Sequence, residues 1–225
     1  MVKHTVLAAS TTPDGERLTL TREGLEMVVR VRGETLMSTR RSGSEQVMAT
    51  LALPADAPPS DVHVLIGGLG IGYTLRAVLD RIGPTSRVTV LELLGDVVAW
   101  NRGPLAACAD YALDDARVEI RVGDLFDYLA AGTTRFDAIL LDVDNGPEAF
   151  TVRSNERLYR VDGLTTVHRA LRPGGMLVVW SAFRSQSFER RLRRAGFDAR
   201  SVPVRARAEV GKGARHTLFV ASRKH

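Results

Sequence analysis

The most constraining feature of this chain is an alternation, from residue 62 onward, between short apolar runs and segments with helical periodicity. The apolar runs are nearly continuous, as expected for strands covered on both faces of a parallel sheet. The alternation predicts an α/β fold with a Rossmann-like, doubly wound, mostly parallel sheet and a site at the carboxyl ends of its strands. The predicted strands are VHVLIGG (62–68), RVTVLEL (87–93), VEIRVGD (118–124), FDAILLDVD (136–144), GMLVVWSA (175–182) and HTLFVAS (216–222).

Helical segments lie between these runs. The periodicity predicts helices over about 154–171, ending before Pro173-Gly174-Gly175, and over 187–196. Upstream, residues 1–53 contain four short strand-like runs separated by hairpin-type turns, followed by a helical pattern over 44–53 with Ser44 as the expected N-cap. The Pro-rich stretch 55–61 marks the boundary. We therefore predict a small N-terminal β-hairpin domain (1–53) and a Rossmann-like catalytic domain (54–225).

Composition narrows the class of protein. Cys108 is the single cysteine, which excludes an internal disulfide and a cysteine-based zinc cluster, and the five histidines lack metal-ligand spacing. We predict no metal, no membrane span and a cytoplasmic location. The net charge is +5, and arginines are concentrated from residue 184 onward. These arginines could attract an anionic partner such as nucleic acid, or they could simply form a solvated surface. We favour the solvated surface, because no aromatic side chain is interleaved with the arginines to stack on bases.

The segment GGLGIG links the first predicted strand to its helix. Gly67 precedes a GxGxG pattern formed by Gly68, Gly70 and Gly72. The pattern lacks the last glycine of the dinucleotide fingerprint, since Tyr73 stands there. This disfavours an NAD-dependent oxidoreductase. The GxGxG form is typical of sheets that bind S-adenosylmethionine. We interpret the glycines as admitting such a cofactor against bare backbone, although a tight turn between strand and helix would also require them.

Three further strand ends carry candidate ligands. Glu92 ends the second strand, where an acidic group can accept both ribose hydroxyls. Asp124 ends the third strand, where it can accept the adenine amine while Leu125 packs on the ring; the alternative is an N-cap. Asp142 and Asp144 end the fourth strand and share a face if it stays extended. Such a pair suits a base with a raised pKa, although Asp144 also suits a turn.

The segment from Val62 to about Ala182 resembles the spermidine synthase (polyamine aminopropyltransferase) family, a branch of the class I methyltransferase fold. The matching pieces are VLIGGLGIGYTLR, LELLGDVV, VGDLFDYL, FDAILLDVDNGP and RLYRVDGLTTVHRALRPGGMLVVW. The resemblance implies a seven-stranded sheet, a homodimer, and S-adenosylmethionine or its decarboxylated form as the donor. It also implies Asp142 as catalytic base in cofactor contact, with Asp144, Asn145 and Tyr159 placing a small-molecule acceptor.

The chain departs from the family pattern at acidic positions. Gly70 stands where the first loop commonly has aspartate, and Leu94 stands where a second acid commonly follows Glu92. Each departure removes negative charge from a pocket that should hold a dication. We therefore slightly favour a methyltransferase acting on a small-molecule nucleophile. The alternatives are an aminopropyltransferase of polyamine biosynthesis and, more remotely, a nucleic-acid-binding protein that uses the arginines.

Overall fold

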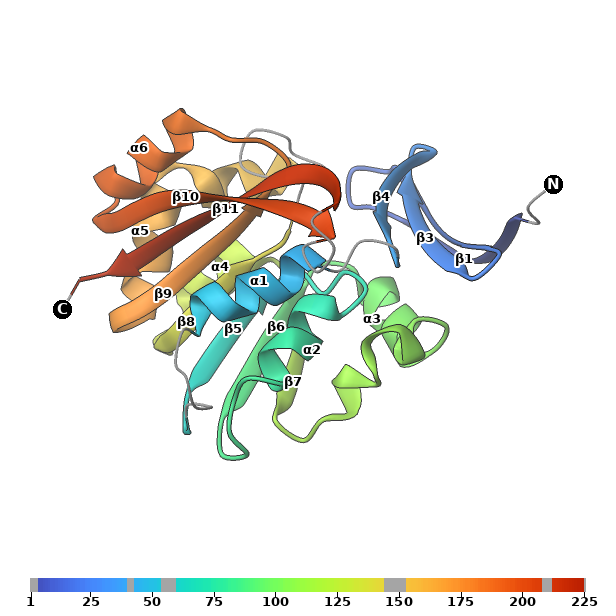
Figure 1. Ribbon diagram of the computed structural model, residues 1–225, viewed down its shortest axis with the longest axis horizontal. Coiled ribbons are helices and arrows are strands. Elements are labelled where there is room, and N and C mark those ends of the chain that lie inside the picture. Colours follow the sequence, from blue (N-terminus) through green and yellow to red (C-terminus); the bar gives the residue numbers. More distant parts are fainter. Residues whose placement is uncertain (1–3, 40–42, 54–59, 144–152, 208–211, 225) are drawn as a thin grey trace.

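The computed structural model describes residues 4–39, 43–53, 60–143, 153–207 and 212–224 (Figure 1). The chain begins with a four-stranded antiparallel sheet in the order β1-β2-β3-β4. Its strands are joined by short turns, as the hairpin signals predict. The bounds are β1 His4–Thr11, β2 Arg17–Glu23, β3 Glu26–Val31 and β4 Glu34–Ser38.

The rest of the chain forms a seven-stranded sheet in the order β10-β11-β9-β8-β5-β6-β7. Strands β7, β6, β5, β8 and β9 pair in parallel, whereas β11 pairs antiparallel with both β9 and β10. The strand order reverses between β5 and β8, and ligands of doubly wound sheets bind at such a point. The bounds are β5 His63–Gly67, β6 Arg87–Glu92, β7 Val118–Val122, β8 Phe136–Leu141, β9 Leu171–Ser181, β10 Phe197–Arg207 and β11 Lys212–Arg223.

Helices cover both faces of this sheet (Figure 1). Their bounds are α1 Gly43–Ala52, α2 Tyr73–Leu79, α3 Gly95–Arg102, α4 Leu125–Ala131, α5 Val161–Ala170 and α6 Gln186–Arg194, with 3-10 turns η1 Ala106–Ala109, η2 Ala112–Asp114 and η3 Arg153–Tyr159. Alternate strand residues enter two cores: Leu140 packs with side chains of α1, α2 and α3, and Leu141 with those of α4, α5 and α6. The apolar runs are continuous because both faces of each central strand are buried.

The predicted α/β class and seven-stranded sheet are confirmed. Two elements differ from the prediction. Strand β10 follows α6 and was not foreseen, and the helix expected over 154–171 is divided into η3 and α5, while Leu171 already begins β9. Helix α1 begins at Gly43, one residue before its expected N-cap Ser44.

The predicted domain boundary falls at residues 53 and 54, and residues 54–59 lie outside the described part of the chain. Helix α1, which the prediction assigns to the N-terminal domain, packs on α2 and against β8, β9, β10 and β11. The division into 1–53 and 54–225 stays a prediction. Within the described residues, no helix combines the length and the apolar character needed to span a bilayer.

Candidate active site

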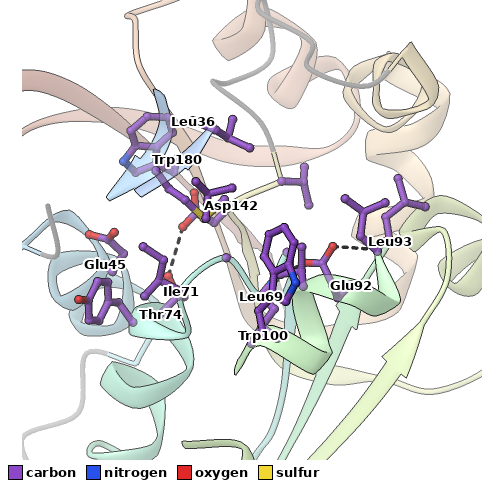
Figure 2. A pocket seen from close by; sticks show the side chains of 18 of the residues that line it. Leu36, Glu45, Leu69, Ile71, Thr74, Glu92, Leu93, Trp100, Asp142 and Trp180 are labelled. Carbon is purple, nitrogen blue, oxygen red and sulfur yellow. Dashed lines mark hydrogen bonds between the residues drawn. The ribbon is translucent and has the colours of Figure 1, made fainter. Parts of the chain in front are cut away.

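A cavity of about 300 Å³ lies where the strand order reverses, at the carboxyl ends of the parallel strands (Figure 2). The segments after β5, β6, β7 and β8 form one side of it. Residues 35–38 of β4, with Thr12, Leu18 and Val29, form another, so the small N-terminal sheet completes the site. Sequence reasoning missed this contribution, because strands near the N-terminus carry no local signal for packing against a distant sheet edge.

The glycine loop enters the cavity through two of its four glycines, Gly68 and Gly70. Both have positive φ, 86° at Gly68 and 56° at Gly70. A Cβ at Gly68 would lie 2.3 Å from the backbone oxygen of Asp142, whereas one at Gly70 would first meet the sulfur of Met37 at 3.5 Å. The close approach at Gly68 is thus made by the protein's own backbone. At Gly70 the loop backbone lines the cavity, and the nearest side chain across from it is the flexible Met37.

Glu92 is buried at the end of β6 and ties two loops together. Its Oε2 accepts a hydrogen bond from the Leu69 amide, and its Oε1 accepts one from the Leu94 amide, both at 2.9 Å. Burial raises the pKa of the Glu92 carboxyl, and hydrogen bonds from backbone amides oppose that rise. The carboxylate lines the cavity and has further lone pairs, as the predicted ribose-binding role requires. That role stays a prediction.

Asp124 caps helix α4, which is the alternative that the sequence left open. Its Oδ1 accepts a hydrogen bond from the Asp127 amide at 3.1 Å and pairs with Arg157 at 2.8 Å. Asp124 also lines the cavity, together with Leu125. The Leu125 side chain occupies the space that a Cβ at Gly67 would need, at 2.4 Å. Capping and adenine binding are compatible here, and the second of these stays a prediction.

Asp142 follows β8 and is half-buried at the cavity. Burial raises the pKa of its carboxyl from 3.8 to about 6, partly opposed by a hydrogen bond that the Thr74 hydroxyl donates to Oδ2 at 3.3 Å (Figure 2). Thr74 lies in the first turn of α2, directly after the glycine loop. Sequence reasoning missed Thr74; its position one turn from a glycine loop that faces Asp142 is the signal that could have found it.

Of the three residues predicted to bind the substrate, Tyr159 alone lies in the described part of the chain. Asp144 and Asn145 lie outside the described residues. Tyr159 is 1% exposed, and its ring packs edge-on against Phe188 at 5.7 Å in the core beneath α5 and α6. It is absent from the described cavity lining. The described residues place the Tyr159 ring in the core, and its role in placing the substrate stays a prediction.

Trp180 of β9 also lines the cavity. Its ring lies edge-on to His216 of β11, with 4.7 Å between the ring centres. Both side chains line the same cavity as Asp142, and Figure 2 shows Trp180, Leu36 and Asp142 among the lining residues. Trp180 and Leu36 make this part of the lining aromatic and apolar.

Acidic side chains supply the formal charge of the described cavity lining. Its described lining contains the carboxylates of Glu45, Glu92, Asp124 and Asp142 and includes no lysine or arginine. In Figure 2, Glu45 and Glu92 lie on opposite sides of the pair formed by Thr74 and Asp142. Glu45 comes from α1 and was missed by sequence reasoning, which counted the acids absent at Gly70 and Leu94 but not one supplied by another element. The described site can therefore hold a ligand with separated positive charges.

Comparison with known proteins gives the family. Residues 44–192 match the model of the spermine/spermidine synthase domain. The polyamine aminopropyltransferase 1 of Hyperthermus butylicus is 30% identical over 161 residues, which cover 68% of this chain and 54% of that protein. The polyamine aminopropyltransferase 2 of Pseudomonas aeruginosa is 32% identical over 138 residues, covering 60% of this chain and 37% of that protein.

Two solved structures share the fold. Spermidine synthase from Thermotoga maritima has a TM-score of 0.74 at 20% identity, over 96% of this chain and 72% of that one. A spermidine synthase in complex with the transition-state analogue AdoDATO has a TM-score of 0.73 at 20% identity, with the same coverage of both chains. The matched part of this chain spans about half of the Hyperthermus butylicus protein and about a third of the Pseudomonas aeruginosa protein. It spans 32% of a polyamine aminopropyltransferase from Bacillus mycoides.

The preference for a methyltransferase is wrong. The matching family model is that of spermine and spermidine synthases, and these curated relatives are aminopropyltransferases. The preference rested on a pocket depleted in acids, and Glu45 restores one of the charges that Gly70 and Leu94 fail to supply. The predicted resemblance is confirmed over about two-thirds of the sequence, and the chain belongs to the spermine/spermidine synthase domain family.

Proposed function

We propose that the protein is an aminopropyltransferase, which moves the aminopropyl group of decarboxylated S-adenosylmethionine to the nitrogen of a small amine. The observation that carries the proposal is the half-buried Asp142 carboxyl, with its raised pKa, at the carboxyl end of β8, in a cavity whose described lining has carboxylates and neither lysine nor arginine. A base that accepts a proton from an ammonium works best with a pKa near the operating pH, and an ordinary exposed aspartate is too acidic.

The charge of the cavity supports the decarboxylated donor over the intact one. Intact S-adenosylmethionine carries a carboxylate, and burying it beside Glu92 and Asp142 with no lysine or arginine in the described lining would be costly. The decarboxylated form has a sulfonium and an ammonium, so both of its charges are attracted. A small di- or polyamine acceptor adds further positive charge, which Glu45 is placed to balance.

The described residues fit such a donor. A volume of about 300 Å³ lies at the lower end of the range for small-molecule sites. Glu92 would hold the ribose hydroxyls, Asp124 the adenine amine, and Leu125 the face of the ring. The donor, when bound, supplies a carbon that its positive sulfur makes electrophilic.

Asp142 accepts a proton from the acceptor amine. As the acceptor nitrogen forms its bond to the propyl carbon, the bond from that carbon to sulfur breaks and its electron pair stays on sulfur. The nitrogen has a lone pair for this attack because its ammonium has first given a proton to the Asp142 carboxylate, whose Oδ2 accepts a hydrogen bond from the Thr74 hydroxyl at 3.3 Å. The enclosing side chains, Trp180 among them, exclude water and hold the amine in line with the reacting carbon.

Catalysis should depend on pH through Asp142. Because the base must be ionised, we expect kcat/KM to fall about tenfold per pH unit below pH 6, near the raised pKa of about 6. An ordinary aspartate would keep activity down to about pH 4. Initial rates between pH 4.5 and 8 measure this limb. A profile that stays flat down to pH 4.5 would remove Asp142 as the base.

The proposed function itself is tested with two donors. The purified protein is incubated with 1,4-diaminobutane and either decarboxylated S-adenosylmethionine or intact S-adenosylmethionine, and the products are identified by mass spectrometry. We expect a triamine and 5′-methylthioadenosine from the decarboxylated donor only. A methylated amine with the intact donor, or no product with either donor, would refute the proposal. Asp142→Asn serves as the control for contaminating activity.

Three further expectations from the sequence belong to this proposal: a homodimer, a cytoplasmic location, and the division into two domains. They follow from the family resemblance and from the turn and composition signals of residues 1–61. Size-exclusion chromatography with light scattering tests the first of them.

A further inference from the structure

We propose that Arg157 is a positioning residue, which fixes the Asp124 carboxylate so that the donor site selects a purine with a 6-amino group. The inference rests on the proposed function. Arg157 lies in η3, the segment that leads into α5. Its guanidinium contacts Asp124 Oδ1 through Nη2 at 2.8 Å and Asp127 Oδ1 through Nη1 at 2.9 Å. It also lies over the Phe126 ring, 4.7 Å from the ring centre.

The two oxygens of Asp124 are used unequally. Oδ1 receives both Arg157 and the Asp127 amide. Oδ2 has no hydrogen-bond partner among the described residues, and it belongs to a side chain that lines the cavity. The torsion between Cβ and Cγ of aspartate is soft and nearly two-fold, so one amide alone could be satisfied by either oxygen. Two donors that converge on Oδ1 remove that freedom and leave Oδ2 for a ligand.

The value of Arg157 lies in geometry rather than in stability. Its side chain is 40% exposed, and ion pairs of such exposure contribute little to folding. Its backbone, however, is held closely, because a Cβ at Gly163 would lie 2.1 Å from the Arg157 carbonyl oxygen. The guanidinium reaches α4 from a backbone that packs closely on Gly163 of α5, and it contacts residues 124, 126 and 127.

The chemical consequence is purine discrimination. A free carboxylate oxygen accepts a hydrogen bond from a 6-amino group and repels a 6-oxo group. If Arg157 is removed, Asp124 keeps its capping hydrogen bond, but its carboxylate can rotate about the bond between Cβ and Cγ. The repulsion between the Asp124 and Asp127 carboxylates is then no longer offset by the guanidinium. Adenine should then bind less tightly, and the site should distinguish adenine from hypoxanthine less well.

The test measures binding rather than turnover, with 5′-methylthioadenosine and 5′-methylthioinosine as calorimetric probes. For the unaltered protein, we expect 5′-methylthioadenosine to bind at least tenfold more tightly than 5′-methylthioinosine. In Arg157→Gln, that ratio should fall toward one, and the Kd for the adenine compound should rise about tenfold. Arg157→Lys, which keeps one charge but cannot bridge both aspartates, should restore the ratio in part. Arg160→Gln is the matched control, because Arg160 pairs only with exposed Glu156 among the described residues.

The outcomes separate the two proposals. An unchanged ratio in Arg157→Gln, with normal binding of the adenine compound, would overturn the role of Arg157 and leave the proposed function standing. Failure of the unaltered protein to bind either nucleoside would overturn the donor site and the inference together. A general loss of folding would lower the affinity for both nucleosides alike, so a changed ratio in a protein of unchanged melting temperature supports the inference.

Discussion

Asp142→Asn is expected to lower kcat by about 10²- to 10⁴-fold, the range that removal of a general base produces. Asparagine has nearly the same shape and can keep the contact with Thr74, but it cannot take up the proton of the attacking amine. Steady-state rates over a range of donor and acceptor concentrations measure the effect. The Kd of 5′-methylthioadenosine should change little, because Asp124 and Glu92, not Asp142, are assigned to the nucleoside.

The matched control lies on β8, the strand that leads to Asp142. Asp137 stands at the opposite end of β8, where it accepts a hydrogen bond from the His63 amide at 2.7 Å and pairs with Arg172. Asp137→Asn removes the same charge from β8 itself, far along the strand from the cavity. Its activity should stay near that of the unaltered protein. Equal losses in the two variants would mean that β8 is merely sensitive to lost charge, and Asp142 would no longer be supported as the base.

Asp142→Asn should also stabilise the fold at neutral pH. The pKa of Asp142 is raised from 3.8 to about 6, so the native state binds more protons than the unfolded state between these values. The free energy of unfolding therefore falls as pH rises through that window, by up to about 3 kcal/mol at pH 7. Asparagine removes this cost. Urea unfolding at pH 7 and pH 4 should show a gain for Asp142→Asn that shrinks at the lower pH; a loss of stability at pH 7 would contradict the burial argument.

Most of the sheet could be predicted because its signals are local. A strand covered by helices on both faces needs a continuous apolar run, and β5, β6, β8 and β9 have one. Strand β10 was missed because it lies at the edge of the sheet, where FDARSVPVRAR alternates apolar residues with exposed arginines such as Arg200 and Arg205. Such a segment looks like a basic surface loop when its partner strand is unknown, and charge on an edge strand also guards against unwanted pairing.

The site was predictable only where it depends on strand ends. Asp142 and Glu92 come together because parallel strands deliver their carboxyl ends to one edge of the sheet, a rule that needs no tertiary information. Glu45 and Met37 reach the same cavity from α1 and β4 through packing between distant segments. The missing knowledge of Glu45 is what made the pocket seem too weakly acidic for a polyamine, and so led to the wrong reaction.

Gly68→Ala is expected to be the most damaging small substitution in the loop. At φ 86° an alanine is strained by about 1–2 kcal/mol, and its Cβ would stand 2.3 Å from the Asp142 carbonyl oxygen, a distance that no rotamer relieves. With overpacking of about 1–3 kcal/mol, the total loss should be about 2–5 kcal/mol. For a chain of this length, that lowers the melting temperature by roughly 5–20 °C.

Gly70→Ala is the control that separates backbone strain from the steric clash with Asp142. Gly68 and Gly70 lie in the same loop and both have positive φ, but a Cβ would clash with backbone at Gly68 alone of these two. At Gly70 the nearest atom to an added Cβ is the Met37 sulfur at 3.5 Å, an ordinary contact, so only the conformational strain of about 1–2 kcal/mol applies. Urea unfolding should therefore place Gly68→Ala well below Gly70→Ala in stability. Activity should also diverge: Gly68→Ala pushes on the backbone that carries Asp142 and should lower kcat, whereas Gly70→Ala adds a methyl group to the cavity wall and should mainly raise KM for the donor. Equal stabilities would show that the backbone at Asp142 can move away, and the rigid placement of the base at the end of β8 would have to be abandoned.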